Sequence, residues 1–150
     1  MEKVENNLIE SFVILNRVFL DNQIRYCVIG AIAASFWGEP RFTRDVDFLV
    51  AAPSRDIDRL VGLFKKEVFS IETKGEDQIS ITSKGELPFL ADLIISKIDY
   101  QEWVIDRAQI VKMFGTEVPI CSAEDLIILK LIANRRQDLV DIEATLKYHY

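Results

Sequence analysis

One stretch, from Tyr26 to Val50, constrains the fold of this chain more than any other part of the sequence. It begins with an apolar run that ends at Gly30, continues into a short segment of small residues that is compatible with a helix, and ends in an apolar strand, 45–50. Gly30 permits a tight turn between strand and helix, because glycine adopts backbone conformations that other residues avoid. The sequence therefore predicts a strand, a turn, a helix and a second strand in succession.

Asp45 and Asp47 lie two residues apart at the start of that second strand. Because side chains alternate along a strand, both carboxylates are expected on one face, about 6–7 Å apart along the backbone. Two like charges beside an apolar strand are unfavourable unless a cation neutralises them. The pattern indicates either a divalent metal site or a strand with one face in water, and for two aspartates alone the second alternative is the commoner one.

A third carboxylate, Asp92, is the one charged residue in the apolar run 89–95. An unpaired carboxylate is costly to remove from water, so this aspartate is expected to be paired, protonated or metal-bound. If its strand lies beside the strand of Asp45, the three carboxylates form the kind of cluster that two-metal phosphoryl transfer requires.

Composition and charge disfavour several competing functions. The single histidine, His149, is the penultimate residue, where a general base is hard to hold in place, so Ser-His-Asp and Cys-His hydrolases and histidine-based metal sites are not expected. The two cysteines suggest neither a disulfide framework nor a zinc site, which favours a reducing compartment. The net charge of −6 does not support sequence-independent nucleic-acid binding, although Arg41 and Arg44 could form a local basic rim beside the aspartates.

The length of 150 residues fits one domain, and the proportions of 49% hydrophobic and 28% charged residues are those of an ordinary soluble protein. No segment has the pattern of a signal peptide, and no apolar run approaches the ~20 residues that a membrane span needs. We therefore expect a single cytoplasmic domain, 1–150, without membrane attachment.

Hydrophobic periodicity and turn residues predict the remaining elements. Together they predict an α/β (α+β) fold, with a mixed, partly antiparallel sheet of about five or six strands and helices packed mainly on one side. Helices are expected at 4–20, 54–67, 100–108, 126–133 and 138–150, and further strands at 24–29, 68–73, 78–82, 110–114 and 117–120.

The C-terminal part of the chain carries several charges. The helix 126–133 is nearly all apolar and is expected to be buried, with Lys130 in its middle reaching either the surface or a phosphate. Asp138 and Asp141 follow two arginines, and we interpret these four residues as a structural ion-pair network rather than a second site.

Several of these residues, taken together, resemble the motifs of a known family. Gly30 at a strand–helix turn, the Arg-x-Thr-x-Asp-x-Asp pattern within PRFTRDVDF, the isolated Asp92 and the tail VPICSAEDLIILKLIANRRQDLVDI are similar to the nucleotidyltransferase superfamily with the DNA polymerase β-like fold. Within it, the chain most resembles the small prokaryotic branch that includes the abortive-infection type toxin nucleotidyltransferases. The resemblance runs from Tyr26 to Ile142.

This resemblance implies transfer of a nucleoside monophosphate from a nucleoside triphosphate to a hydroxyl, with release of pyrophosphate and with Mg²⁺ or Mn²⁺ as cofactor. By position, Asp45 and Asp47 would bind the metals, and Asp92 would be the third ligand that orients or deprotonates the attacking hydroxyl. The acceptor stays open between an RNA end, a protein and a small molecule, as do a protein partner, a homodimer and a toxin–antitoxin role. Nucleotide contacts would come from Gly30, Ala31, Arg41, Thr43, Arg44 and Lys130.

One position departs from the family signature, which has Gly or Ser after the glycine where this chain has Ala31. Alanine keeps the backbone donor but lacks the serine hydroxyl. The sequence also ends soon after the last helix, without the extra domain that holds the acceptor in larger relatives, so we expect a small acceptor or one presented by a partner.

Two main function classes follow. The three carboxylates favour an active enzyme, whereas Ala31 favours a catalytically weak or inactive module for nucleotide sensing or partner binding. A carboxylate–metal phosphohydrolase, which would release phosphate without labelling an acceptor, is a third alternative.

Overall fold

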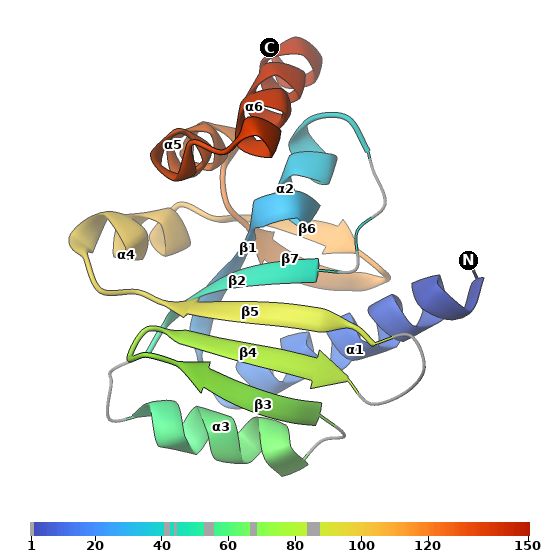
Figure 1. Cartoon of the computed structure of the whole chain (residues 1–150), viewed down its shortest axis with the longest axis vertical. Coiled ribbons are helices and arrows are strands. Elements are labelled where there is room, and N and C mark those ends of the chain that lie inside the picture. Colours follow the sequence, from blue (N-terminus) through green and yellow to red (C-terminus); the bar gives the residue numbers. More distant parts are fainter. Residues whose placement is uncertain (1, 41–42, 44, 53–55, 67–68, 84–87) are drawn as a thin grey trace.

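The protein is represented by a computed structural model that describes residues 2–40, 43, 45–52, 56–66, 69–83 and 88–150. A mixed sheet with the strand order β3-β4-β5-β2-β1-β7-β6 forms its centre (Figure 1). The strands are β1 (Arg25–Ile29), β2 (Asp45–Ala51), β3 (Phe69–Lys74), β4 (Gln78–Ser83), β5 (Leu90–Ile95), β6 (Gln109–Met113) and β7 (Thr116–Ile120). The helices are α1 (Glu2–Asp21), α2 (Gly30–Trp37), α3 (Ile57–Lys66), α4 (Asp99–Asp106), α5 (Ala123–Ala133) and α6 (Arg136–His149).

The predicted mixed sheet is confirmed, with seven strands in the described part of the chain where about five or six were expected. β2 runs antiparallel to β1 and parallel to β5, and β1 runs parallel to β7. The strands β3, β4 and β5 are joined in antiparallel pairs. This order places β2, with its two aspartates, in the middle of the sheet and next to the strand of Asp92.

One face of the sheet packs against α1 and α3 through a cluster of aromatic rings. The ring centroid of Phe48 on β2 lies 5.8 Å from that of Phe12 and 5.3 Å from that of Phe19. Phe19 also stacks on Tyr26 at 4.3 Å and meets Phe64 of α3 at 5.7 Å. All five rings are buried. Because side chains alternate along β2, a strand that sends Phe48 into this core sends Asp45 and Asp47 to the opposite face.

The opposite face carries the other helices over β1 and β2. α2 begins directly after β1, and α4 is tied to the start of β1 by ion pairs from Arg25 to Glu102 and Asp106. α5 and α6 pack against each other and against α2, so that α2 lies between the sheet and this helix pair (Figure 1). Among the described residues, no helix is both long and apolar enough to cross a membrane.

The expectation that the helix 126–133 is buried is wrong. Ile128, Leu131 and Ile132 of α5 are 41%, 55% and 71% exposed, whereas Asp125 and Lys130 are buried. The two charged residues are inside because each has ion-pair partners there, and they share the inward side of the helix with Leu126, whereas the three exposed apolar residues face outward. Hydrophobicity alone therefore gives the wrong orientation for α5.

Replacing Phe48 by alanine is expected to lower the free energy of unfolding by about 3–5 kcal/mol, because packed aromatic neighbours do not collapse into the cavity that is left. Phe36→Ala is the matched control, since its ring is 42% exposed; the same truncation there is expected to cost less than about 1.5 kcal/mol. Urea denaturation of both variants measures the difference, and equal losses would contradict the placement of Phe48 at the centre of the core.

Candidate active site

Asp47 and Asp92 are paired directly across the parallel strands β2 and β5. The same row of the sheet continues to Ser80 on β4 and, on the other side, to Ile29 at the end of β1. Residues paired in this way share one face, and neighbouring strands are about 4.8 Å apart. The strand of Asp92 thus lies beside the strand of Asp45, which is the condition that the three-carboxylate interpretation set.

The electrostatics of the site reflect this crowding of negative charge. The pKa of the Asp47 carboxyl is raised to about 6, first by burial and then by the negative charges of Asp92 and Asp45. The positive charges of Lys130 and Arg135 act in the opposite direction. Carboxylates that raise the pKa of a neighbour also attract a cation, because a cation removes the repulsion between them.

The donor set suits a divalent ion in its chemistry. Mg²⁺ and Mn²⁺ prefer carboxylate oxygens, which Asp45, Asp47 and Asp92 supply from one face of the sheet. Among the residues that the structure describes, however, no group of three or more His, Cys, Asp or Glu side chains is drawn together closely enough to hold a metal ion. The arrangement therefore offers suitable ligands without forming a closed metal site.

Gly30, the first residue of α2, has φ of +69°, in the region that favours glycine. A Cβ atom placed on Gly30 would collide with the carboxylate of Asp47. Glycine is therefore required here for two reasons: it adopts the turn, and it allows the Asp47 side chain to lie against the backbone at the start of the helix.

The N-terminus of α2 has the properties of an anion site. Its N-cap residue, Ile29, makes no side-chain capping bond, and its first turn contains no acidic residue. The first backbone N–H groups of a helix, here including that of Ala31, attract anions such as phosphate. A donor site for phosphate thus lies directly beside a group of carboxylates, an arrangement that suits a phosphate accompanied by its own metal ion.

Two side chains that the sequence analysis did not single out hold Asp92 in place. Ser80 Oγ donates to Asp92 Oδ1 at 2.6 Å, and Gln78 Nε2 donates to the same oxygen at 3.3 Å. Both bonds end on Oδ1, so among the described residues they leave Oδ2 of Asp92 for a ligand. The signal in the sequence was the alternation of Gln78, Ser80 and Thr82 with buried isoleucines along β4.

Of the other residues predicted to contact the nucleotide, Thr43 lies within the described part of the chain and two arginines do not. The hydroxyl of Thr43 accepts a bond from the backbone N–H of Asp45 and donates one to its carbonyl, both at 3.1 Å, so it fixes the start of β2. Arg41 and Arg44 lie outside the described residues. Their roles stay predictions.

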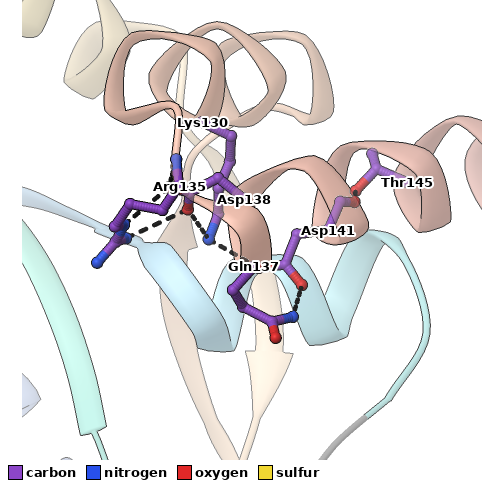
Figure 2. Close-up of polar contacts among 6 residues, drawn as sticks. All are labelled: Lys130, Arg135, Gln137, Asp138, Asp141 and Thr145. Carbon is purple, nitrogen blue, oxygen red and sulfur yellow. Dashed lines mark hydrogen bonds and ion pairs between the residues drawn. The ribbon is translucent and has the colours of Figure 1, made fainter.

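Lys130 does not reach the surface, so that alternative of the sequence analysis is wrong. It is 6% exposed, and its ammonium lies 3.1 Å from Asp138 Oδ1 and 2.8 Å from Asp141 Oδ2 (Figure 2). Arg135 also pairs with Asp138, at 2.8 Å. Within the predicted ion-pair network, the pair of Arg135 with Asp138 is confirmed, whereas Asp141 pairs with Lys130. The buried carboxylates on α6 explain why Lys130 stays inside.

Arg135 is the residue whose position the sequence did not reveal. It lies at the turn between α5 and α6, where Asn134 adopts the left-handed conformation with φ of +51°. This turn brings the Arg135 charge close enough to lower the pKa of Asp47. Arg135 and Asp47 are far apart in the sequence, and no local pattern indicates that the charge of one acts on the other.

Gly30→Ala is expected to lower the free energy of unfolding by about 1–3 kcal/mol, because the new methyl group forces strain on the backbone and displaces Asp47. Gly62→Ala is the matched control: a Cβ atom there meets nothing within 4 Å, and alanine in a helix is expected to add about 0.5–1 kcal/mol. Thermal unfolding of both variants tests this, and a stabilised Gly30→Ala would contradict the close approach.

The pH dependence of stability should report on Asp138. Burial opposes its ionisation, but hydrogen bonds from the side chain and backbone N–H of Arg135 and from Lys130 lower its pKa from 3.8 to about 2. A lowered pKa stabilises the fold above the unfolded value, so about 2 kcal/mol should be lost as the pH falls from 4 towards 2. Urea denaturation should show the gap between wild type and Asp138→Asn closing over this range, and a constant gap would contradict the assignment.

The sequence of the chain matches a known protein family. Residues 6–149 match the family described as nucleotidyltransferase of unknown function (DUF6036). No curated protein sequence matches the chain significantly.

Several solved structures share the fold. An antigenic nucleotidyltransferase-like protein from Paracoccidioides brasiliensis has a TM-score of 0.66 at 22% identity, over 95% of this chain and 76% of its own. The lincosamide antibiotic adenylyltransferase LnuA, with lincomycin bound, has a TM-score of 0.67 at 15% identity, over 94% and 96%. The antibiotic-resistance factor ANT(2'')-Ia has a TM-score of 0.69 at 11% identity, over 98% and 85%. With the paired aspartates beside a glycine-initiated helix and a family match over nearly the whole length, this chain belongs to the nucleotidyltransferases.

Proposed function

We propose that this chain is a metal-dependent enzyme that transfers a nucleoside monophosphate from a nucleoside triphosphate to a hydroxyl group. The observation that carries the proposal is the pairing of Asp47 with Asp92 across β2 and β5, next to the start of α2 at Gly30. Acidic ligands and backbone phosphate donors are the two components that nucleotide transfer needs, and here they are adjacent. Membership of a nucleotidyltransferase family supports the same reaction class.

The nucleotide would bind across this junction. The first-turn N–H groups of α2 would donate to its phosphates, beside the Asp47 carboxylate that lies against Gly30. Asp45, Asp47 and Asp92 would hold Mg²⁺ or Mn²⁺, which supplies charge neutralisation and makes the acceptor hydroxyl more acidic.

Asp92 would act on the acceptor. Its Oδ1 is held by Ser80 and Gln78, so Oδ2 would orient the acceptor hydroxyl and accept its proton. The hydroxyl oxygen then forms a bond to the α-phosphorus, while the bond from that phosphorus to the bridging oxygen of the β-phosphate breaks. The electron pair leaves with pyrophosphate, and the nucleoside monophosphate stays on the acceptor.

We further propose a small molecule with hydroxyl groups as the acceptor. The row of Asp92 and Ser80 continues to Glu72 on β3, whose side chain is exposed. Among the described residues, the row of Asp92, Ser80 and Glu72 is acidic and holds no positive charge that would attract an RNA backbone. Two solved structures of similar fold support this by analogy. LnuA has lincomycin bound, and ANT(2'')-Ia is in complex with adenylyl-2''-tobramycin.

The direct test is transfer of label from each α-labelled nucleoside triphosphate, with Mg²⁺, to a panel of hydroxylated antibiotics and sugars, to total RNA or to protein. Label is expected on a small molecule, with a loss of about 100-fold or more in Asp47→Asn and Asp92→Asn. Asp58→Asn, at an exposed position on α3, is the control and should retain wild-type transfer.

The other outcomes separate the alternatives. Label on RNA or protein would contradict the small acceptor and favour the toxin–antitoxin role. Nucleotide binding without transfer would favour a sensing module, and phosphate release without a labelled acceptor would favour a phosphohydrolase. Undiminished transfer in Asp92→Asn would contradict the proposed mechanism.

A further inference from the structure

A buried cluster of charges joins α5 to α6 (Figure 2). Lys130, Asp138 and Asp141 are 6%, 0% and 5% exposed, and the lysine bonds both aspartates. Gln137 Nε2 donates to Asp141 Oδ1 at 3.0 Å. Removing one member of a buried charge network leaves an uncompensated charge, so such a network holds its members in fixed positions.

The charges of this cluster are distributed unevenly. Its buried part contains one positive group, Lys130, and two negative groups, Asp138 and Asp141, so it needs one more cation. Arg135 supplies that cation from the outside, with its side chain 73% exposed. The cluster is therefore neutral as a whole, with its accessible positive end at Arg135.

Asp138 fixes the direction of the Arg135 guanidinium. Arg135 Nε lies 2.8 Å from Asp138 Oδ2, and Nη2 lies 3.2 Å from Oδ1, while the backbone N–H of Arg135 donates to Oδ2 at 3.0 Å. Such two-point pairing sets the plane of the guanidinium. It uses two of the five N–H donors, so three are left for a ligand as far as the described residues are concerned.

The Arg135 side chain lies on the side of the cluster next to α2. Figure 2 shows Arg135 at the edge of the cluster where the first turn of α2 lies, and α6 packs against α2. Asp47, which lies against Gly30 at that turn, is acted on by the charges of both Lys130 and Arg135. Lys130 lowers the pKa of Asp47 more than Arg135 does, but its ammonium is paired with two carboxylates. Arg135 keeps N–H donors that can bind a ligand.

We propose that Arg135 binds the phosphates of the nucleoside triphosphate and that the buried Lys130–Asp138–Asp141 cluster positions the Arg135 side chain. This inference rests on the proposed function. Lys130 is then a positioning residue rather than the phosphate ligand expected from the sequence. A planar guanidinium with several donors suits a phosphate chain that lies between the α2 N-terminus and the carboxylates. The site is thus completed by the α5–α6 turn, from the far end of the chain.

Calorimetric titration with Mg²⁺ and inorganic tripolyphosphate, and with each nucleoside triphosphate and monophosphate, tests this subsite. Arg135→Gln should weaken binding of tripolyphosphate and triphosphates about 10- to 100-fold, and of monophosphates less than about threefold. Its melting temperature should fall, because the buried Asp138 loses a pairing partner, so the diagnostic result is the selective loss of triphosphate over monophosphate binding. Arg135→Lys keeps the charge but not the two-point pairing, and should give intermediate binding.

Arg136→Gln is the matched control, because it removes the same charge from the next residue, which is also exposed; its binding should equal that of the wild type. If the wild type binds triphosphate and transfers label, but Arg135→Gln and Arg136→Gln bind triphosphate equally well, this inference alone is overturned. A fall in melting temperature with equal loss of monophosphate binding would show a structural role and also overturn it. A wild type that binds no phosphate probe would overturn the proposed function as well.

Discussion

The contact between the Asp47 carboxylate and the backbone of Gly30 is the interaction on which the rest of the site depends. It requires a residue without a side chain at a positive φ, and it holds a partly buried acid against the start of a helix. The pairing of β2 with β5 adds Asp92, and with it a second negative charge. An apolar core on the other face, centred on Phe48, provides the stability that allows this repulsive arrangement to persist.

Much of the sheet and half of the site were predictable from local patterns. Alternation along β2 predicted that Asp45 and Asp47 share one face, and Gly30 at the end of β1 predicted the turn into α2. The partner of Asp92 was not predictable in this way, because strand order is a property of the whole sheet. Local patterns indicate that both strands exist but not that they are neighbours.

The C-terminal helices show the limit of hydrophobicity as a guide. The apolar residues of α5 predicted a buried helix, but Lys130 and Asp125 compete for the interior through their ion pairs, and Ile132 is exposed. Arg135 illustrates a second limit. Arg135 follows a left-handed residue, Asn134, in the turn between two helices, and its charge acts on Asp47. Periodicity carries no information about such a turn.

The strand pairing has a consequence for how the chain folds. Asp47 and Asp92 are distant in the sequence and meet only when the parallel pairing of β2 with β5 forms, which is a non-local event of the slow kind. An unfolded or partly folded chain therefore lacks the paired carboxylates and binds a metal–nucleotide complex weakly. A ligand that binds across this pair recognises the folded chain alone, so it stabilises the sheet by an amount that grows with the ratio of free ligand concentration to Kd.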